Sequence, residues 1–350
     1  MNKNNGLPGV VTPTIRKDYI MKKIRWGVLS TARIGTKKVI PAMQLGEYCT
    51  VTAIASRRLE KAQAAASQLG IEKAYGSYEE LLADPDIDAV YIPLPNHLHV
   101  PWSIKALNAN KHVLCEKPIG LNADEAQKLL GVARKFPRQK IMEAFVYKHH
   151  PQWQWVKQKV SKGEIGEVRT IQSFFSYYNS DPNNIRNKAD LGGGGLMDIG
   201  CYCISLSRFI FEDKPRRICG IIEEDTNMKI DRLTSGILEF ADGTSIFTCA
   251  TQLVRYQRVN IFGTKRRIEI EIPFNAPPDR SCKVWYGDST RVEEVAFEVC
   301  NQYTIQGDLF SRAVLEDREV PVPLEDAVEN MQVIDALVRS VESKSWVNFC

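Results

Sequence analysis

The sequence predicts an α/β protein with a doubly wound parallel sheet in its N-terminal part, followed by an α+β domain with a large, mostly antiparallel, open-faced sheet. The first part is indicated by short apolar runs that alternate with helix-like stretches from residue 24 to about residue 143, a pattern typical of repeated β-α units. The second part is indicated by a change after about residue 150, where Gly236–Phe240, Ala241-Asp242-Gly243 and Thr244–Ala250 make a strong hairpin signal. The chain has 350 residues, and a single hydrophobic core does not usually support a chain of that length. Two domains are therefore expected.

The N-terminal elements follow one another closely. Apolar runs predict strands at Ile24–Leu29, Val51–Ser56, Ala89–Ile92, His112–Cys115 and Lys140–Glu143. The helices between them are marked by their ends: Gly70 follows Leu59–Leu69 as a C-terminal cap, Ser77 opens a capping box, and Asn122 caps a later helix. Pro41 lies inside the first helix-like stretch and should kink it or mark its limit.

The later elements complete the division of the chain. Val168–Phe175 is typical of a strand, and Ile261–Lys265 of a further hairpin turn. An apolar stripe at helical spacing near the C-terminus predicts a last helix that packs on the protein. We therefore expect three segments, which are an N-terminal arm at 1–21, the parallel-sheet domain at 22–143 and the α+β domain at 144–350.

The composition argues against several classes of function. The net charge is +4 without a long basic run, so nucleic acid is not an expected partner. No stretch approaches the roughly 20 apolar residues of a membrane helix, and the polar arm lacks the apolar core of a signal peptide. The nine cysteines are scattered, and Cys201 and Cys203 have no second pair to complete a zinc pattern. We expect reduced thiols, no metal site and a cytoplasmic protein.

The turn after the first strand is a candidate nucleotide site, because ligands of doubly wound sheets bind beyond the carboxyl ends of the strands. It has Ser30 and Ala32 where a glycine fingerprint usually has its first two glycines, and Gly35 as the third. Backbone N–H groups at such a helix start suit a pyrophosphate, and small side chains still permit its approach. The predicted contacts are Ser30, Thr31, Ala32, Arg33 and Ile34; the alternative is a plain strand-to-helix turn.

The end of the second strand indicates which dinucleotide binds. It reads Ser56-Arg57-Arg58, without the acidic side chain that usually holds the ribose 2′-hydroxyl of NAD. Arginine suits a 2′-phosphate, which offers negative charge and several acceptor oxygens. Ser56, Arg57 and Arg58 therefore favour NADP over NAD as cofactor, unless both arginines are simply solvated charges at a helix end.

The run Cys115-Glu116-Lys117-Pro118 indicates a second functional group. It ends an apolar strand. Removing the lysine ammonium from water there costs free energy, unless another group interacts with its charge. An X–Pro bond is the usual place for a cis peptide, which would turn Lys117 inward.

Five runs in this order carry a resemblance to a known family. They are Ile92-Pro93-Leu94-Pro95-Asn96-His97-Leu98-His99, Lys111-His112-Val113-Leu114-Cys115-Glu116-Lys117-Pro118, Met142-Glu143-Ala144-Phe145, His150-Pro151-Gln152, and Gly192-Gly193-Gly194-Gly195-Leu196-Met197-Asp198-Ile199-Gly200-Cys201-Tyr202. From about residue 22 the chain resembles the glucose-fructose oxidoreductase / inositol dehydrogenase / MocA family. Asn184-Ile185-Arg186 and Tyr202 are similar to the branch of dimeric dihydrodiol dehydrogenases, NADP-linked xylose dehydrogenases and glucose-fructose oxidoreductase.

The resemblance implies hydride transfer between nicotinamide C4 and a carbinol carbon, with Tyr202 as the group that takes the hydroxyl proton. A free tyrosine is a weak base at neutral pH, so we expect the Lys117 ammonium to lower the pKa of Tyr202. Asp198 lies four residues before Tyr202, on the same face if a helix begins there, and would bind a substrate hydroxyl or position Lys117. Each of the three has a structural alternative: Lys117 as an ion-pair partner of Glu116 or Glu143, Asp198 as a helix-start acid and Tyr202 as a core aromatic with a bonded hydroxyl.

The resemblance also implies further contacts. Cofactor contacts are expected from Leu94, Pro95, Asn96, His99, Glu116, Lys117, Glu143 and Arg186. Substrate contacts are expected from Lys117, Tyr147, Arg186, Asp198 and Tyr202. Glu116 and Glu143 would serve the nicotinamide ribose or Lys117. The alternatives are a satisfied structural histidine for His99, a loop salt bridge for Arg186, and buried carboxylates with structural partners for Glu116 and Glu143.

The preferred function is an NADP-dependent sugar oxidoreductase that converts an aldose to its lactone or reduces a carbonyl in reverse. One alternative is an oxidoreductase of trans-dihydrodiols or dicarbonyls, and another is a non-catalytic NADP-binding sensor. Because an open sheet face needs cover, and the family associates through it, we expect a homodimer or homotetramer through the C-terminal sheet. The expected partners are thus a sugar or diol and further copies of the chain, with no nucleic acid and no membrane.

Overall fold

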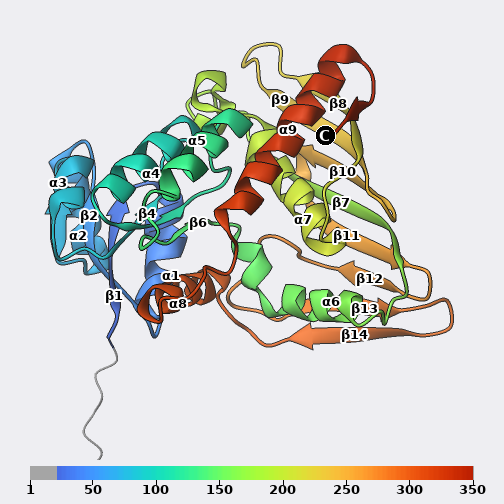
Figure 1. Ribbon diagram of the computed structural model, residues 1–350, viewed down its shortest axis with the longest axis horizontal. Coiled ribbons are helices and arrows are strands. Elements are labelled where there is room, and N and C mark those ends of the chain that lie inside the picture. Colours follow the sequence, from blue (N-terminus) through green and yellow to red (C-terminus); the bar gives the residue numbers. More distant parts are fainter. Residues whose placement is uncertain (1–21, 350) are drawn as a thin grey trace, which may run out of the picture.

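The computed structural model describes residues 22–349, so the arm predicted at 1–21 lies outside the described residues. Two sheets lie side by side (Figure 1). The N-terminal sheet is parallel throughout, in the order β3-β2-β1-β4-β5-β6. Its strands are β1 Ile24–Leu29, β2 Cys49–Ala55, β3 Lys73–Tyr75, β4 Ala89–Ile92, β5 His112–Cys115 and β6 Ile141–Glu143. This order, with β1 beside both β2 and β4, places the switch between the two halves at β1.

The helices between these strands begin and end at the capping residues that the sequence predicted. They are α2 Leu59–Leu69, α3 Tyr78–Ala83, α4 His99–Asn108 and α5 Ala123–Ala133. Gly70 ends α2 with φ of 65°, and the Ser77 hydroxyl accepts the Glu80 N–H at 3.2 Å. The first helical stretch runs through a π-helical segment, η1 Gly35–Val39, into α1 Ile40–Gln44. Pro41 thus occupies the start of α1, where its missing N–H costs little.

The second sheet has nine strands in the order β14-β13-β12-β11-β7-β10-β9-β8-β15. Its strands are β7 Val168–Tyr178, β8 Arg217–Glu224, β9 Asp231–Glu239, β10 Thr244–Ala250, β11 Gln252–Gly263, β12 Arg267–Ile270, β13 Cys282–Gly287, β14 Val292–Phe297 and β15 Val347–Asn348. All neighbours are antiparallel except β7 and β10. The predicted α/β fold class, with a Rossmann sheet and a mostly antiparallel second sheet, is confirmed.

One face of the second sheet is covered and the other is open. The cover consists of α6 Pro151–Ser161, α7 Cys201–Phe211 and α9 Leu324–Ser343 (Figure 1). Strand β10 shows the contrast, since Phe247 and Cys249 are buried beneath the helices whereas Ile246 points to the open face and is exposed. The apolar stripe predicted for the last helix is buried in α9.

The chain returns to the N-terminal sheet before it ends. Helix α8, Gln302–Leu315, packs beside α1 and β1. The Trp26 indole N–H donates to the Ser311 hydroxyl at 3.0 Å, and the Trp26 and Phe310 rings are 5.3 Å apart. Asp308 accepts the N–H of Tyr48 at 2.8 Å. Part of the segment expected to form the second domain is therefore core of the first.

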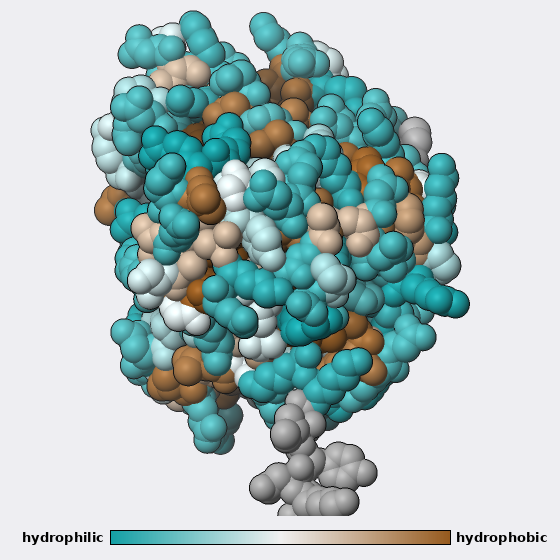
Figure 2. All heavy atoms as spheres, turned by 90° about the vertical axis from the view of Figure 1, so that its left-hand side faces the viewer, coloured by the Kyte–Doolittle hydropathy of each residue, from teal (hydrophilic) through white to brown (hydrophobic). Residues whose placement is uncertain are grey.

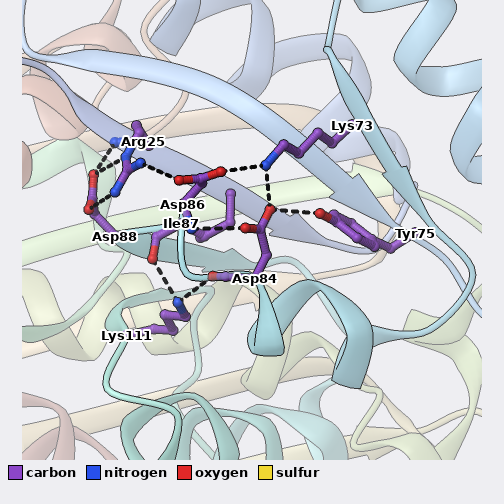
Figure 3. Close-up of polar contacts among 8 residues, drawn as sticks. All are labelled: Arg25, Lys73, Tyr75, Asp84, Asp86, Ile87, Asp88 and Lys111. Carbon is purple, nitrogen blue, oxygen red and sulfur yellow. Dashed lines mark hydrogen bonds and ion pairs between the residues drawn. The ribbon is translucent and has the colours of Figure 1, made fainter.

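The amino ends of the parallel strands are joined by a polar network (Figure 3). Arg25 makes two bonds to Asp88, of 3.0 and 2.9 Å. Lys73 bonds Asp84 at 2.9 Å, and Lys111 donates to the carbonyls of Asp84 and Ile87 at 2.7 and 2.8 Å. The opposite, carboxyl edge of the sheet carries the predicted site residues.

Candidate active site

The turn after β1 has the backbone shape of a glycine fingerprint although Ser30 and Ala32 stand where glycines are usual. Ser30 has φ of 133°, a conformation that favours glycine, and its Oγ accepts the Ala32 N–H at 2.9 Å. Helical backbone starts at Arg33. The first N–H groups of a helix have no acceptor within it, so this turn suits an anion.

Arg57 and Arg58 follow β2 at the same edge and are exposed. In the part of the chain that the structure describes, neither has a carboxylate partner. Ser56 is buried, and its Oγ accepts the Arg58 N–H at 3.4 Å. Arg57 borders a pocket of about 380 Å³, whose lining is Arg57, Gly76, Ser77, Tyr78, Glu79, Leu98 and Trp102. Burial raises the pKa of Tyr78, and the nearby Arg57 guanidinium opposes that rise.

The segment after β4 joins the two halves of the site. It contains Leu94, Pro95 and the short helix η2, Asn96–Leu98. The Asn96 amide donates to the Gly192 carbonyl at 2.7 Å. Gly192 has φ of 79°, and a Cβ there would lie 2.3 Å from the Leu121 side chain, so only glycine fits this approach.

Lys117 and Asp198 form the centre of the site. The Lys117-Pro118 peptide is cis, as hypothesised from the sequence. The Lys117 Nζ donates to the Asp198 carbonyl at 2.5 Å and to its carboxylate at 3.1 Å. Burial opposes the charge of Lys117, but the Asp198 carboxylate outweighs it and the pKa of Lys117 is raised. Lys117 is therefore an ammonium at neutral pH.

The Asp198 carboxylate is held by two more side chains. Tyr177 on β7 donates its hydroxyl to Asp198 Oδ2 at 2.6 Å, and the Arg186 Nε lies 3.0 Å from the same oxygen. Burial opposes ionisation of Asp198, but Arg186 and Lys117 hold its pKa well below the usual range. The structure thus gives Arg186 an ion pair inside the predicted site.

Tyr202 lies against Lys117. Asp198 is in the π-helical segment η6, Leu196–Gly200, which runs directly into α7, and Tyr202 is the second residue of α7. The Lys117 Nζ is 5.0 Å from the centre of the Tyr202 ring. Among residues 22–349 no hydrogen-bond partner of the Tyr202 hydroxyl is found. The expected lowering of the Tyr202 pKa is wrong for this geometry, because burial raises that pKa and the Lys117 hydrogen bonds go to Asp198.

Glu116 accepts the Tyr91 hydroxyl at 2.5 Å, and burial raises its pKa. His99 is buried, with its ring nitrogens 2.7 Å from the carbonyls of Pro118 and Leu94. Burial lowers the pKa of His99 to about 4, and the hydrogen bonds to the two carbonyls oppose that shift. The structural alternative for His99 therefore describes it better than a cofactor contact.

Two predicted ligand contacts lie in the core instead. Tyr147 is fully buried, and its hydroxyl bonds the Ser205 hydroxyl at 3.0 Å. Glu143 is 2% exposed and accepts the Ile119 N–H at 2.7 Å. Both were expected at ligands because of the family resemblance, but their polar atoms bond Ser205 and Ile119 inside the protein.

Sequence reasoning missed Tyr177 and the aromatic pocket beside Arg57. The strand containing Tyr177 was predicted only to Phe175, and nothing local shows that it extends to Asp198. In the Arg57 pocket, Trp102 and Tyr78 meet edge to face at 4.8 Å, an arrangement between two helices that separate motifs do not reveal.

The described chain shows few other candidate sites. Between residues 22 and 349, no three His, Cys, Asp or Glu residues gather as a metal site, and the eight cysteines in that range are free thiols. No helix in the same range is long and apolar enough to cross a membrane.

The fold and the site together define a dinucleotide-binding oxidoreductase. Residues 24–144 match the model of an oxidoreductase family with an NAD-binding Rossmann fold, and residues 153–269 match the GFO/IDH/MocA C-terminal domain. The chain belongs to the GFO/IDH/MocA oxidoreductase family, as the sequence motifs predicted.

Several relatives are similar over most of the chain. D-xylose 1-dehydrogenase (NADP(+)) 2 of Haloferax volcanii is 39% identical over 92% of this chain and 98% of its own length. Trans-1,2-dihydrobenzene-1,2-diol dehydrogenase of Xenopus laevis is 35% identical over 70% of this chain and 74% of its own. The crystal structure of KijD10, a 3-ketoreductase from Actinomadura kijaniata in complex with NADP and TDP-benzene, superposes with a TM-score of 0.85 at 29% identity, over 91% of this chain and 98% of KijD10.

Proposed function

We propose that this protein is an NADP-dependent oxidoreductase that transfers hydride between the nicotinamide and a sugar carbinol carbon. The reaction is oxidation of an aldose at C1 to a lactone, or the reverse reduction of a carbonyl. The observation that carries the proposal is the Lys117 ammonium, bonded to Asp198 and 5.0 Å from the Tyr202 ring at the carboxyl edge of the parallel sheet. Such an edge is where doubly wound sheets bind nucleotides.

Tyr202 is the proton donor and acceptor in this proposal. Its raised pKa keeps the phenol protonated at neutral pH, which suits donation to the oxygen of a carbonyl that receives hydride. In the oxidation direction the same phenol must first lose its proton, so oxidation should accelerate as the pH rises. Lys117 stabilises negative charge on the substrate oxygen, and Asp198 fixes the position of Lys117.

The residues present fit NADP, which would supply the hydride acceptor or donor when bound. The turn at Ser30–Ile34 would hold the pyrophosphate, and the exposed Arg57 and Arg58 would hold the 2′-phosphate. The aromatic pocket beside Arg57 is of a size and composition suited to the adenosine end. The Haloferax xylose dehydrogenase and the KijD10 complex, both linked to NADP, support this assignment.

An alternative substrate is a trans-dihydrodiol or a dicarbonyl, which the 35% identity to the Xenopus dihydrodiol dehydrogenase supports. The same Tyr202, Lys117 and Asp198 would serve both substrates. A non-catalytic NADP-binding sensor needs the phosphate contacts but has no use for this constellation.

Self-association through the open face of the second sheet is also proposed. Ile237 on β9 and Ile246 on β10 are directly opposite each other and exposed, with Ile221 on β8 beside them. The N-terminal side of the molecule, by contrast, is mainly hydrophilic (Figure 2). An apolar patch on an open sheet commonly marks an interface. Light scattering should show a dimer or tetramer, and Ile246→Glu should shift it toward the monomer.

The decisive experiment replaces the proton donor. NADP+ and NADPH are screened by absorbance against aldoses, dihydrodiols and keto sugars, and the best substrate is used for Tyr202→Phe. We expect this variant to bind NADPH normally and to lose about 10²-fold or more of kcat, the usual range for a general acid. The control Tyr256→Phe removes an exposed hydroxyl on β11 and should change little.

The possible results separate the candidates. Unchanged turnover in Tyr202→Phe would place the proton donor elsewhere. Tight NADPH binding without turnover of any compound would favour the sensor.

A further inference from the structure

Glu143 fixes the segment that carries Lys117. Strand β6 ends at Glu143, which lies opposite Cys115, the last residue of β5. From Cys115 the chain runs through Lys117 to Ile119, whose N–H returns to Glu143 Oε1 at 2.7 Å. The four-residue segment 116–119 is therefore attached to the end of β6 at both of its ends, with Lys117 between them.

Only one of the two carboxyl oxygens of Glu143 has a hydrogen-bond partner among the described residues. The Oε2 atom is buried and has no hydrogen-bond partner among the described residues. A buried carboxylate with one hydrogen bond is costly, whereas a protonated carboxyl is not charged. The side chain contributes to no part of the reaction proposed above.

The buried cations near Glu143 are bonded to other carboxylates. Lys148 from η3, Val146–His149, bonds Asp326 of α9 at 2.5 Å, and Arg208 of α7 bonds the other Asp326 oxygen at 2.9 Å. Arg208 also pairs with Glu329, which the half-exposed Lys214 contacts at 2.9 Å. An ionised Glu143 would therefore be a buried charge without a hydrogen-bonded cation of its own.

The remaining titratable groups near Glu143 are thiols. Cys115 precedes the segment, and Cys201 opens α7 with its Sγ 3.6 Å from the Asp198 carbonyl that also accepts from Lys117. Burial raises the pKa of the Cys201 thiol, Lys117 lowers it and Glu143 raises it, so both side chains lie within electrostatic range of the thiol. Burial, followed by the charge of Asp326, raises the pKa of Glu143 to about 8.

We propose that uncharged Glu143 is the positioning residue for Lys117, and that loss of its proton displaces the Lys117 ammonium from its working position. When Glu143 ionises, its carboxylate competes with Asp326 for Lys148 and strengthens its hold on the Ile119 N–H. The segment 116–119 then shifts relative to Asp198 and Tyr202. This inference rests on the proposed function for its catalytic consequence but not for its structural one.

The sign of the pH dependence follows from the two states of the protein. In the unfolded chain Glu143 ionises near its ordinary pKa of about 4.3, whereas in the native protein it keeps its proton to about pH 8. The native state therefore binds more protons between these values, and stability falls as the pH rises through this window. Glu143→Gln has no proton to lose, so its stability should fall less.

The test uses the full chain and the variants Glu143→Gln and Glu143→Ala, with Glu342→Gln as an exposed control on α9. The 15Nζ resonance of Lys117 is followed by NMR from pH 6 to 9.5. We expect an inflection near pH 8 in the parent and in the control, and none in Glu143→Gln. An inflection of the same size in Glu143→Gln would overturn the proposal.

Kinetics provide a second readout. In the reduction direction we expect the parent kcat to fall about tenfold per pH unit above pH 8, since one proton is lost. Glu143→Gln should stay within about threefold of the parent at pH 6.5 and show no such fall. Glu143→Ala loses the acceptor for Ile119, so its kcat should drop about tenfold at pH 6.5 while its NADPH affinity is retained. Equal pH profiles for parent and Glu143→Gln would contradict the proposal.

The two proposals can fail separately. If no sugar or diol is turned over but the Lys117 resonance follows Glu143, the positioning role stands and the proposed reaction fails. If turnover is found and neither readout responds to Glu143→Gln, the reaction stands and the positioning role fails. Should Glu143→Ala not fold, the glutamine variant still decides.

Discussion

The two edges of the parallel sheet use charge in opposite ways. At the amino edge Arg25, Lys73 and Lys111 all have oxygen partners within 3.0 Å (Figure 3). At the carboxyl edge Arg57 and Arg58 are exposed and have no carboxylate partner in residues 22–349. The sheet thus has a saturated network at its amino edge, whereas its carboxyl edge holds both the Lys117–Asp198 ion pair and two arginines without a carboxylate partner among the described residues.

The difference separates cations that are bonded within the fold from cations that are available to an anion. Partners placed by neighbouring strand ends complete the amino edge, so a further anion would gain nothing there. At the carboxyl edge an anion would find free guanidinium groups and the free N–H groups of a helix start. Substitutions at the two edges should therefore affect different measurements.

The largest effect is expected at the centre of the carboxyl edge, from Lys117→Met. The change keeps most of the side-chain volume and removes the ammonium beside Tyr202, so kcat should fall about 10²-fold or more. Cofactor selectivity, measured as the ratio of NADP to NAD affinity, should not change. The pH profile of oxidation should not move, because burial sets the raised Tyr202 pKa and the hydrogen bonds of Lys117 go to Asp198. Unchanged turnover would leave Lys117 a purely structural residue.

A smaller effect separates the two edges directly. Arg57→Ala should weaken NADP binding about tenfold, the value of one charge-assisted contact of about 1.4 kcal/mol, and leave NAD binding unchanged. Arg25→Ala, the matched change at the amino edge, should leave both affinities unchanged. Titration of cofactor fluorescence measures all four constants. Equal losses for NADP and NAD in Arg57→Ala would mean that Arg57 does not contact the 2′-phosphate.

The smallest effect is expected in stability alone. Lys111→Met leaves the carbonyls of Asp84 and Ile87 without their buried donor, which should cost about 1–3 kcal/mol in the free energy of unfolding. Urea denaturation measures this cost, and NADP affinity should be retained. A loss of affinity without a loss of stability would show that the amino edge also influences the ligand.

The fold was predictable where the signals are local. Gly70 and Ser77 end and begin helices through contacts with residues three or four positions away, and the chain forms α2 and α3 where expected. Strand β3 was missed because its three residues, Lys73–Tyr75, are too short to show a period. Strands β8, β13, β14 and β15 were also missed. β8 and β14 are largely exposed, so they show little of the apolar alternation that marks a strand, and β15 has only two residues.

The site was predictable as a set of motifs but not as a set of contacts. Lys117, Asp198 and Tyr202 do meet, because each belongs to a family run at the end of a strand or the start of a helix. Glu143 and Tyr147 were placed at ligands by the same reasoning and are buried. Their environment depends on Asp326 and Ser205, which arrive from helices far along the chain.

The return of α8 to the N-terminal sheet has a consequence for engineering. Because Phe310 and Ser311 pack against Trp26, the first 150 residues expressed alone would expose an apolar surface that they normally cover. A chimera meant to exchange substrate domains between members of this family should therefore keep residues 302–315 from the same parent as the nucleotide-binding half.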